Sequence, residues 1–297
     1  MNMTQSTRRV ALVTGAAGEL GRAICQRLCR DGFDLAAVDL NLEAAKALVD
    51  ELDVAPGQLA LAIHADLGNE ASITAMVDEV GQAFGRIDVV VNNAGILRDK
   101  PFHKMDDADW DLVYRVHVEG AYKVTRAAWP HLREQAYGRV SFTASTSGIY
   151  GNFGQSNYGM AKLGLYSLTR TLALEGRKHN ILVNAIAPTG GTRMTEGLIP
   201  PQVFERLKRE LVSPLVVYLG SEACQETSGL FEVGGGWIGK TRWERSLGVG
   251  FDPQAGFSPD DVAAHWQQIC DFEGAAHPKD NIEALKEMMA NLQKFSL

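Results

Sequence analysis

Tyr158 and Lys162 are the residues whose types and spacing point most directly to chemistry. Residues i and i+4 share one face of a helix, so the lysine ammonium lies near the phenol and favours the phenolate. A phenol whose pKa falls from its ordinary value of about 10 exchanges a proton with an alcohol near neutral pH. Ser145 comes 13 residues earlier, and its hydroxyl is placed to bond the same substrate oxygen, with Ser147 as the alternative. The pair alone is a weak signal, but the set predicts a general acid/base at Tyr158, assisted by Lys162 and Ser145.

A glycine-rich turn occupies residues 14–21, with the sequence Thr-Gly-Ala-Ala-Gly-Glu-Leu-Gly. It follows a β-branched apolar run and precedes an amphipathic helical pattern. Glycines in that position let the backbone approach a pyrophosphate, which then lies at the N-terminus of the following helix. The turn predicts a dinucleotide site that includes Gly15, Gly18, Leu20 and Gly21. The alternative is a tight strand–helix connection without a ligand.

Asp39 lies 24 residues after Gly15, at the end of the second apolar run. A carboxylate there accepts hydrogen bonds from both hydroxyls of the adenosine ribose and repels a 2′-phosphate. No arginine occupies the turn before the first helix, where Glu19 stands instead. These residues predict NAD as the cofactor and disfavour NADP, unless Asp39 is an ordinary surface residue at a strand end.

Two further apolar runs end in residues suited to a nucleotide. Asp66 and Leu67 follow the third run, where the carboxylate would meet the adenine amino group, although an ordinary loop aspartate is the alternative. Asn93, Ala94 and Gly95 follow the fourth run, and small residues are expected where the backbone comes close to a ligand. Doubly wound sheets bind ligands outside the carboxyl ends of their strands, so these residues join the predicted cofactor site.

Seven short apolar runs alternate with amphipathic helical patterns along most of the chain. The runs occupy residues 10–13, 35–38, 59–63, 87–91, 140–143, 181–185 and 229–233, and the two longest helical patterns occupy 108–135 and 158–174. Parallel strands need crossover connections, so this alternation predicts an α/β fold with a Rossmann-type, doubly wound, seven-stranded parallel sheet.

The domain organisation follows from the same pattern. No linker or repeat interrupts residues 7–240, which we expect to form a single dinucleotide-binding catalytic domain. Residues 241–297 carry no strand pattern, and we expect them to form a C-terminal helical extension packed on or beside that domain.

Composition and charge limit the remaining functional classes. The chain has 297 residues, 45% of them hydrophobic, and a formal charge of −7, which argues against a general nucleic-acid binder or a protein held on an anionic membrane. No apolar run reaches the roughly 18 residues of a spanning helix, and residues 1–9 lack the apolar core of a secretory signal. The four cysteines form no Cys-x-x-Cys pair, so no metal site is expected. The chain ends in Phe-Ser-Leu and lacks the Ser-Lys-Leu peroxisomal address, so we expect a cytoplasmic protein.

Taken together, the motifs resemble the short-chain dehydrogenase/reductase family over roughly residues 7–240. The resemblance rests on ordered motifs: the 14–21 turn, Asp66, residues 92–95, Ser145, the Tyr158/Lys162 pair and Pro188. It implies that Tyr158 is the acid/base, that Lys162 binds the nicotinamide ribose and lowers the tyrosine pKa, and that Ser145 orients the substrate oxygen. It also implies that Pro188 and Thr192 lie beside the cofactor, with Thr192 near its carboxamide.

Four segments further resemble one branch of this family, the (3R)-hydroxyacyl-CoA dehydrogenases. They are residues 116–118, 148–155, 229–240 and 242–245. The likeness implies NAD-dependent oxidation of a (3R)-3-hydroxyacyl-CoA to the 3-ketoacyl-CoA, in a homodimer whose substrate is an acyl-CoA or a similar hydroxy compound. Larger proteins of that branch carry hydratase and sterol-carrier parts, so this chain is expected to be a stand-alone dehydrogenase. The alternative is a steroid or other secondary-alcohol dehydrogenase, and the remote alternative is a non-catalytic NAD-binding regulatory protein.

Three positions depart from the usual pattern of the family. Glu19 stands where a motif glycine is usual, His117 where a catalytic asparagine is usual, and Thr189 follows Pro188 in place of a glycine. The branch shares the histidine, so His117 joins the candidate catalytic residues, with a role through its backbone or a water. A buried or capping histidine is the alternative.

Overall fold

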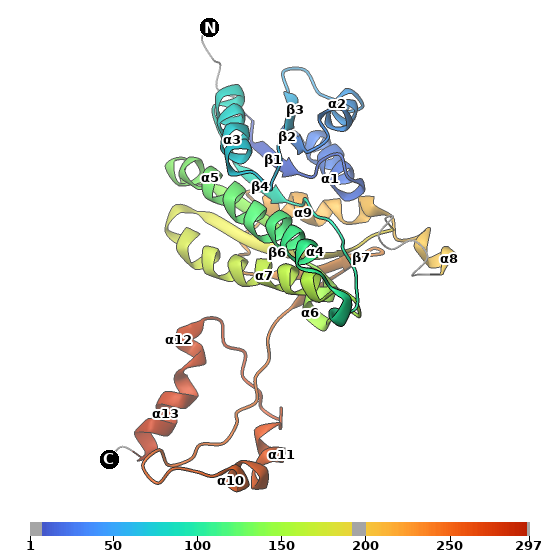
Figure 1. The fold of residues 1–297 in the computed structure, drawn as a ribbon. Coiled ribbons are helices and arrows are strands. Elements are labelled where there is room, and N and C mark those ends of the chain that lie inside the picture. Colours follow the sequence, from blue (N-terminus) through green and yellow to red (C-terminus); the bar gives the residue numbers. More distant parts are fainter. Residues whose placement is uncertain (1–7, 192–199, 296–297) are drawn as a thin grey trace. The chain divides into compact units, whose positions relative to one another are not determined.

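The computed structural model describes residues 8–191 and 200–295 and divides the chain into two compact units, residues 1–240 and 241–297 (Figure 1). The first unit is a sheet covered by helices, and the second holds short helices joined by loops. Thr192, which the sequence placed beside the cofactor, lies outside the described residues. No helix in the described ranges is long and apolar enough to cross a membrane.

β-Branched and other apolar residues form the strands of the first unit. These are β1 (Val10–Thr14), β2 (Asp34–Asp39), β3 (Ala60–His64), β4 (Val89–Asn92), β5 (Gly138–Thr143), β6 (Ile181–Thr189), β7 (Leu230–Gly234) and β8 (Trp237–Thr241). They lie in the order β3-β2-β1-β4-β5-β6-β7-β8, and β1 to β7 run parallel. The order reverses between β1 and β4, the switch point at which doubly wound sheets bind ligands. The predicted fold class is confirmed.

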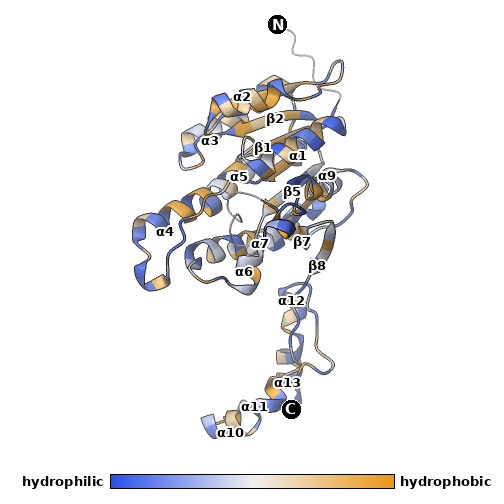
Figure 2. Ribbon diagram, turned by 90° about the vertical axis from the view of Figure 1, so that its right-hand side faces the viewer, coloured by the Kyte–Doolittle hydropathy of each residue, from blue (hydrophilic) through white to orange (hydrophobic). Residues whose placement is uncertain are grey.

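Helices cover both faces of the sheet. They are α1 (Glu19–Arg30), α2 (Leu42–Asp50), α3 (Glu70–Phe84), α4 (Asp107–Tyr114), α5 (Gly120–Glu134), α6 (Thr146–Tyr150), α7 (Ser156–Gly176), α8 (Pro201–Phe204) and α9 (Ser213–Gly220). Val10 and Leu12 face the core beneath α3, α5 and α7, whereas Ala11 and Val13 face the core beneath α1, α2 and α9. The strands are therefore apolar on both sides, as parallel strands between helices must be. Helices α1 and α4 carry both apolar and polar residues, as their mixed orange and blue bands show in Figure 2.

The helical stretch predicted at 108–135 is real, but it is not uniform. Helix α4 passes into a π-helical segment, Arg115–Glu119, which continues directly into α5. A π-helical turn holds one residue more than an α-helical turn and is often found at functional sites. Periodicity cannot reveal this widened turn, because the apolar pattern on either side of it stays helical.

The eighth strand corrects the prediction that the series ends at residue 233. Gly235 and Gly236 connect β7 to β8 with φ angles of 57° and 85°. Positive φ at both central residues is the geometry of a two-residue hairpin turn, and so short a connection permits only antiparallel pairing. The Gly-Gly pair between two apolar runs was the signal for this hairpin.

The C-terminal unit has little core of its own. Its helices are α10 (Pro259–Ala264), α11 (Trp266–Ile269), α12 (Asn281–Ala284) and α13 (Lys286–Phe295), and none contains a buried residue. An antiparallel bridge between Arg245 and Ala276 and the stacked rings of Phe251 and Phe257 join its loops.

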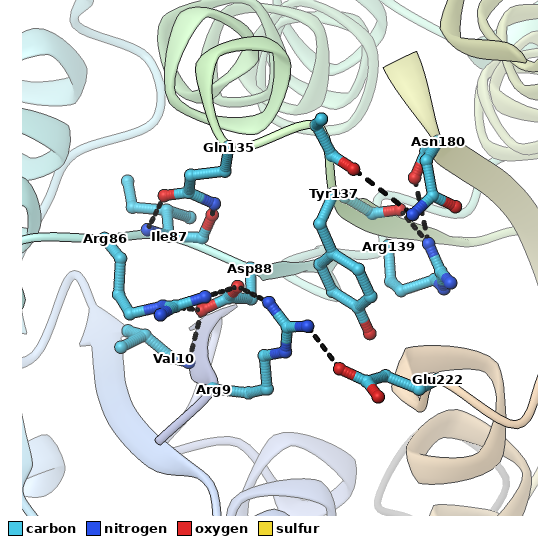
Figure 3. A network of polar contacts seen from close by, with 12 residues as sticks. Arg9, Val10, Arg86, Ile87, Asp88, Gln135, Tyr137, Arg139, Asn180 and Glu222 are labelled. Carbon is cyan, nitrogen blue, oxygen red and sulfur yellow. Dashed lines mark hydrogen bonds and ion pairs between the residues drawn. The ribbon is translucent and has the colours of Figure 1, made fainter. Parts of the chain in front are cut away.

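A buried carboxylate, Asp88, fixes the amino end of β4. It accepts hydrogen bonds from the main-chain nitrogen of Val10 at 2.9 Å, from Arg9 at 2.8 Å and from Arg86 at 2.7 Å (Figure 3). The carboxylate is fully inaccessible to solvent. The two guanidiniums and the amide therefore offset the cost of burying a charge.

An aromatic ring continues the same cluster toward β5. The Tyr137 ring lies between two guanidiniums, with the Arg9 carbon 3.7 Å and the Arg139 carbon 4.2 Å from its centroid. Arg9 also bonds Glu222 beyond α9 (Figure 3). The cluster ties β1, β4 and β5 together at the sheet edge opposite the switch point.

Replacing Asp88 with alanine should lower the free energy of unfolding by about 2–4 kcal/mol, because the Val10 amide loses its acceptor and two guanidiniums lose their buried partner. Urea unfolding of the purified variant measures this loss. Glu222→Gln is the matched control, since it removes a carboxylate from the exposed end of the same cluster and should cost far less. Equal losses in the two variants would contradict the role given to Asp88.

Candidate active site

The turn after β1 requires its glycines. Gly15 has a φ of 63°, and a Cβ there would lie 2.7 Å from the Ala94 Cα. A Cβ on Gly21 would lie 2.1 Å from the Gly15 carbonyl oxygen. Gly18, which is exposed, is the N-cap of α1 and has no side chain to cap the first amides of the helix. The turn is thus a cradle of bare backbone at a helix N-terminus, and it suits the diphosphate of a dinucleotide.

Hydrogen bonds hold the end of β4 against this turn. The Thr14 hydroxyl accepts from the main-chain nitrogens of Asn93 at 3.1 Å and Ala94 at 3.2 Å. In return the Asn93 side-chain amide donates to the carbonyls of Thr14 at 3.1 Å and Gly15 at 3.2 Å. Gly95 comes next, and a Cβ there would lie 2.4 Å from the His117 ring. The small residues predicted at this strand end are needed for close packing.

Asp39 points back at the glycine-rich turn. One carboxylate oxygen accepts from the Ala17 amide at 3.0 Å and the other from the Asn41 amide at 2.9 Å. Each carboxylate oxygen has a second lone pair, so both can still accept from a ribose hydroxyl. Asp39 therefore shapes the turn and carries a negative charge beside it.

The remaining predicted cofactor residues lie at the same sheet edge in different settings. Asp66 is exposed, and its carboxylate accepts from the Gly68 amide at 2.8 Å. Leu67 is partly buried and packs against the core beneath α5. Pro188 lies within β6, which runs four residues further than predicted, and pairs with Val233.

Helix α7 carries Tyr158 and Lys162 on one face, as their spacing predicts. The lysine nitrogen lies 5.5 Å from the centroid of the Tyr158 ring. Lys162 is buried, and its ammonium donates to the Thr143 carbonyl at 2.6 Å. Ser145 is the N-cap of α6, accepting from the Ser147 amide at 3.1 Å, and its side chain is hydrogen-bonded to Tyr158. The structure therefore brings Tyr158, Lys162 and Ser145 together.

The pKa of Tyr158 departs from expectation. Burial raises it above its ordinary value, the hydrogen bond from Ser145 opposes that rise, and the negative charge of Asp99 adds to it. Burial also lowers the pKa of Lys162 to about 7, because its partner is a carbonyl and not a carboxylate. A lysine that is partly neutral near pH 7 stabilises the phenolate of Tyr158 only weakly. The expectation that Lys162 lowers the tyrosine pKa stays a prediction for the enzyme with its cofactor bound.

His117 lies in the π-helical segment and is a buried, neutral side chain. Burial and the nearby Lys162 lower its pKa to about 3. Its Nε2 lies 2.9 Å from both the nitrogen and the carbonyl oxygen of Ile96, and the tautomer decides which of them it bonds. The ring meets the Tyr158 ring edge-on, with centroids 5.4 Å apart. Its Nδ1 has no partner among the described residues. His117 thus supports Tyr158 by packing, and it cannot contribute a positive charge near neutral pH.

Sequence reasoning missed a clamp in front of Tyr158. The Asn157 side chain accepts from the Tyr158 amide at 2.7 Å and donates to the Arg98 carbonyl at 3.1 Å. The Gln155 amide donates to the Asp99 carboxylate at 2.7 Å. Both clamp residues are buried. Neither side chain caps α7, so no helix-start signal in the sequence marks these two residues.

Comparison with known proteins identifies relatives over nearly the whole chain. The family described as "short chain dehydrogenase" matches residues 9–200. The peroxisomal multifunctional enzyme type 2 of Mus musculus is 46% identical over 96% of this chain and 40% of that protein. The peroxisomal hydratase-dehydrogenase-epimerase of Neurospora crassa is also 46% identical, over 96% of this chain and 32% of that protein. This chain thus spans less than half the length of these relatives.

A solved structure agrees with the sequence relatives. The full-length peroxisomal multifunctional enzyme type 2 of Drosophila melanogaster superposes with a TM-score of 0.80 at 33% identity. The match covers 98% of this chain and 50% of that one. The similarity therefore extends beyond the sheet into the C-terminal unit.

Replacing Lys162 with methionine should stabilise the protein at low pH. The folded-state pKa of about 7 lies below the ordinary 10.5, so the unfolded chain binds more protons between these values. The wild type should therefore carry the full cost of the buried ammonium below pH 7 and lose that cost as the pH rises to about 10.5. We expect the variant to gain about 1–3 kcal/mol at pH 6, after the lost bond to the Thr143 carbonyl is deducted.

Urea unfolding at pH 6, 8 and 10 measures this effect. The difference between variant and wild type should shrink steadily across the series. A difference that does not change with pH would mean that the folded-state pKa of Lys162 stays close to its ordinary value of 10.5, contrary to this prediction.

Proposed function

The chain belongs to the short-chain dehydrogenase/reductase family and is an oxidoreductase acting on CH–OH groups; on that premise we propose that it oxidises a (3R)-3-hydroxyacyl-CoA to the 3-ketoacyl-CoA with NAD. The observation that carries the proposal is the hydrogen-bonded Tyr158 and Ser145, with Lys162 behind them, at the carboxyl edge that also holds the glycine-rich turn.

The choice of substrate rests on the relatives and on the branch-like segments. The Neurospora protein is named a hydratase-dehydrogenase-epimerase. A hydratase adds water to a double bond and so produces a hydroxyl group, which a dehydrogenase can then oxidise. The segments 148–155 and 229–240, which resemble hydroxyacyl-CoA dehydrogenases, support an acyl-CoA over a steroid.

The cofactor residues proposed for this chain are those at the switch point. The backbone of Gly15, Gly18 and Gly21 would hold the diphosphate, and Asp39 the adenosine ribose. NAD, when bound, accepts a hydride from the substrate carbon. The other proposed contacts are Leu20, Asp66, Leu67, Asn93, Ala94, Gly95, Tyr158, Lys162, Pro188 and Thr192.

The chain's own residues handle the proton. Tyr158, as phenolate, takes the hydroxyl proton of the substrate, and Ser145 bonds the same oxygen and holds it in place. The raised pKa of Tyr158 means that the phenolate fraction grows with pH, so oxidation should be faster in alkaline solution. His117 packs against the phenol and limits its movement.

Two further parts of the proposal concern assembly and location. The homodimer is proposed from the resemblance of residues 148–155 and 229–240 to the hydroxyacyl-CoA dehydrogenase branch. The expected cytoplasmic location stays a prediction, and the relatives named peroxisomal make the peroxisome the location to test beside it.

The preference for NAD over NADP should depend on Asp39. Like charges brought together cost several kcal/mol, so kcat/KM with NAD should exceed that with NADP by at least about 30-fold. Asp39→Asn keeps an acceptor but removes the charge, and it should lower this ratio by about tenfold. Steady-state kinetics with both cofactors measure the ratio, and Asp50→Asn at the exposed end of α2 is the charge-matched control. An unchanged ratio in Asp39→Asn would place the discrimination elsewhere.

NADH formation with a panel of substrates tests the proposed reaction. We expect turnover of (3R)-hydroxyacyl-CoAs and little or none of the (3S) forms or of steroids. Tyr158→Phe should lower kcat at least about 100-fold while leaving NADH affinity within about twofold, because the lost hydroxyl acts on the proton. Tyr218→Phe, at an exposed tyrosine of α9, is the control.

The other outcomes of the panel are equally informative. Turnover of steroids alone would favour the alternative dehydrogenase. Binding of NADH without turnover of any compound would favour a regulatory protein.

A further inference from the structure

We infer that Arg209 is a dinucleotide-binding residue, whose guanidinium contacts the diphosphate at the first turn of α1 while it neutralises Glu19. The inference rests on the proposed binding of a dinucleotide at that turn. It assigns a role to Glu19, whose presence in the glycine-rich turn the reaction does not explain.

Glu19 places a negative charge at the glycine-rich turn, where the diphosphate would bind. It is the first residue of α1, directly after the N-cap Gly18. A carboxylate at a helix N-terminus is favourable in itself, because it meets the positive end of the helix dipole. A dinucleotide diphosphate carries two negative charges and would approach the same amides. Glu19 would therefore repel the ligand unless a cation stood beside it.

The structure supplies that cation from a distant part of the chain. The Arg209 Nη1 lies 3.0 Å from the Glu19 Oε1, and both side chains are only about one-third exposed, at 36% and 33%. Arg209 begins the 3₁₀ turn η4 (Arg209–Leu211), which packs against α1. The region just after η4, including α9, lies beside α1 in Figure 1. A residue 190 positions away thus pairs with the first residue of α1.

Arg209 is also held in place. Val212 follows η4 and is fully buried in the core beneath α1 and α9. The Ser213 hydroxyl donates to the Glu210 carbonyl at 2.9 Å, and the Val212 amide donates to the Arg209 carbonyl at 3.0 Å. A guanidinium on an anchored turn loses little further freedom when a ligand binds.

The geometry of arginine allows it to serve both anions. A guanidinium has five N–H donors in a planar fork, and a carboxylate uses two of them at most. The remaining donors suit phosphate oxygens. An ordinary surface ion pair would contribute little to stability and nothing to binding. What points to the ligand is the position of the partner, because Glu19 is the first residue of α1 and directly follows the N-cap Gly18.

Binding measurements with four variants test this inference without turnover. NADH and ADP are titrated by calorimetry against wild type, Arg209→Gln, Glu19→Gln, the double variant and Lys208→Gln. Lys208 is the exposed neighbour of Arg209, so Lys208→Gln makes the same change in net charge. We expect Arg209→Gln to weaken both ligands at least about fivefold, as the loss of a charged hydrogen bond implies. Lys208→Gln should stay within about twofold of wild type.

The double variant distinguishes direct contact from mere neutralisation. If Arg209 touches the diphosphate, the double variant binds at least about fivefold more weakly than Glu19→Gln alone. If Arg209 only cancels Glu19, the two bind equally, and that result overturns the inference. Adenosine has no phosphate, so its affinity, measured by competition with NADH, should be the same in wild type and Arg209→Gln.

The same titrations separate this inference from the proposed function. A wild type that binds neither NADH nor ADP would refute the dinucleotide site itself. A wild type that binds both, with Arg209→Gln unchanged, would refute only the role of Arg209. Thermal unfolding without ligand confirms that each variant is folded.

Discussion

The parallel pairing of β1 with β4 is the constraint on which the whole site depends. It brings together the ends of two strands that are almost eighty residues apart in the chain, and the Thr14 hydroxyl then bonds two amides of the β4 end. The Asn93 side-chain amide in turn donates hydrogen bonds to two carbonyls of the glycine-rich turn. Close approach of the backbones leaves no room for a Cβ at Gly15. Effective catalysis needs reacting groups held in fixed geometry, and this crossed set of bonds fixes one wall of the site.

The other wall is built from buried groups that resist ionisation. Lys162 is buried against a carbonyl, His117 is buried in a neutral form, and Tyr158 is harder to ionise than in water. Each has a displaced pKa because burial penalises its charged form. Such displaced values are typical of sites in which protons move, and they trade stability for reactivity. The long sheet and its two apolar cores supply the surplus stability that this arrangement requires.

Sequence periodicity predicted the seven parallel strands because each is a short apolar run between helices. The glycine-rich turn and the Tyr158/Lys162 spacing predicted residues that the fold does bring to one edge. The alternation of apolar runs and helical patterns does not reveal the π-helical segment around His117, because its flanks remain helical. It does not reveal β8 either, because β8 follows β7 after a short glycine turn with no helix between them. The rise in the Tyr158 pKa could not be predicted, since burial is a property of the packed molecule. The pairing of Glu19 with Arg209 joins parts of the chain that no local pattern connects.

The charged cluster around Asp88 lies at the amino edge of the sheet, whereas every candidate site residue placed by the structure lies toward the carboxyl edge or on the helices next to it. The amino edge therefore stabilises the sheet, whereas the carboxyl edge carries the candidate site. Loops at the carboxyl edge are free to accumulate substitutions that alter what the enzyme recognises, because the registry of β1, β4 and β5 is secured from the opposite side. A fold divided in this way is well suited to evolutionary change, since a new specificity need not begin with a loss of structure.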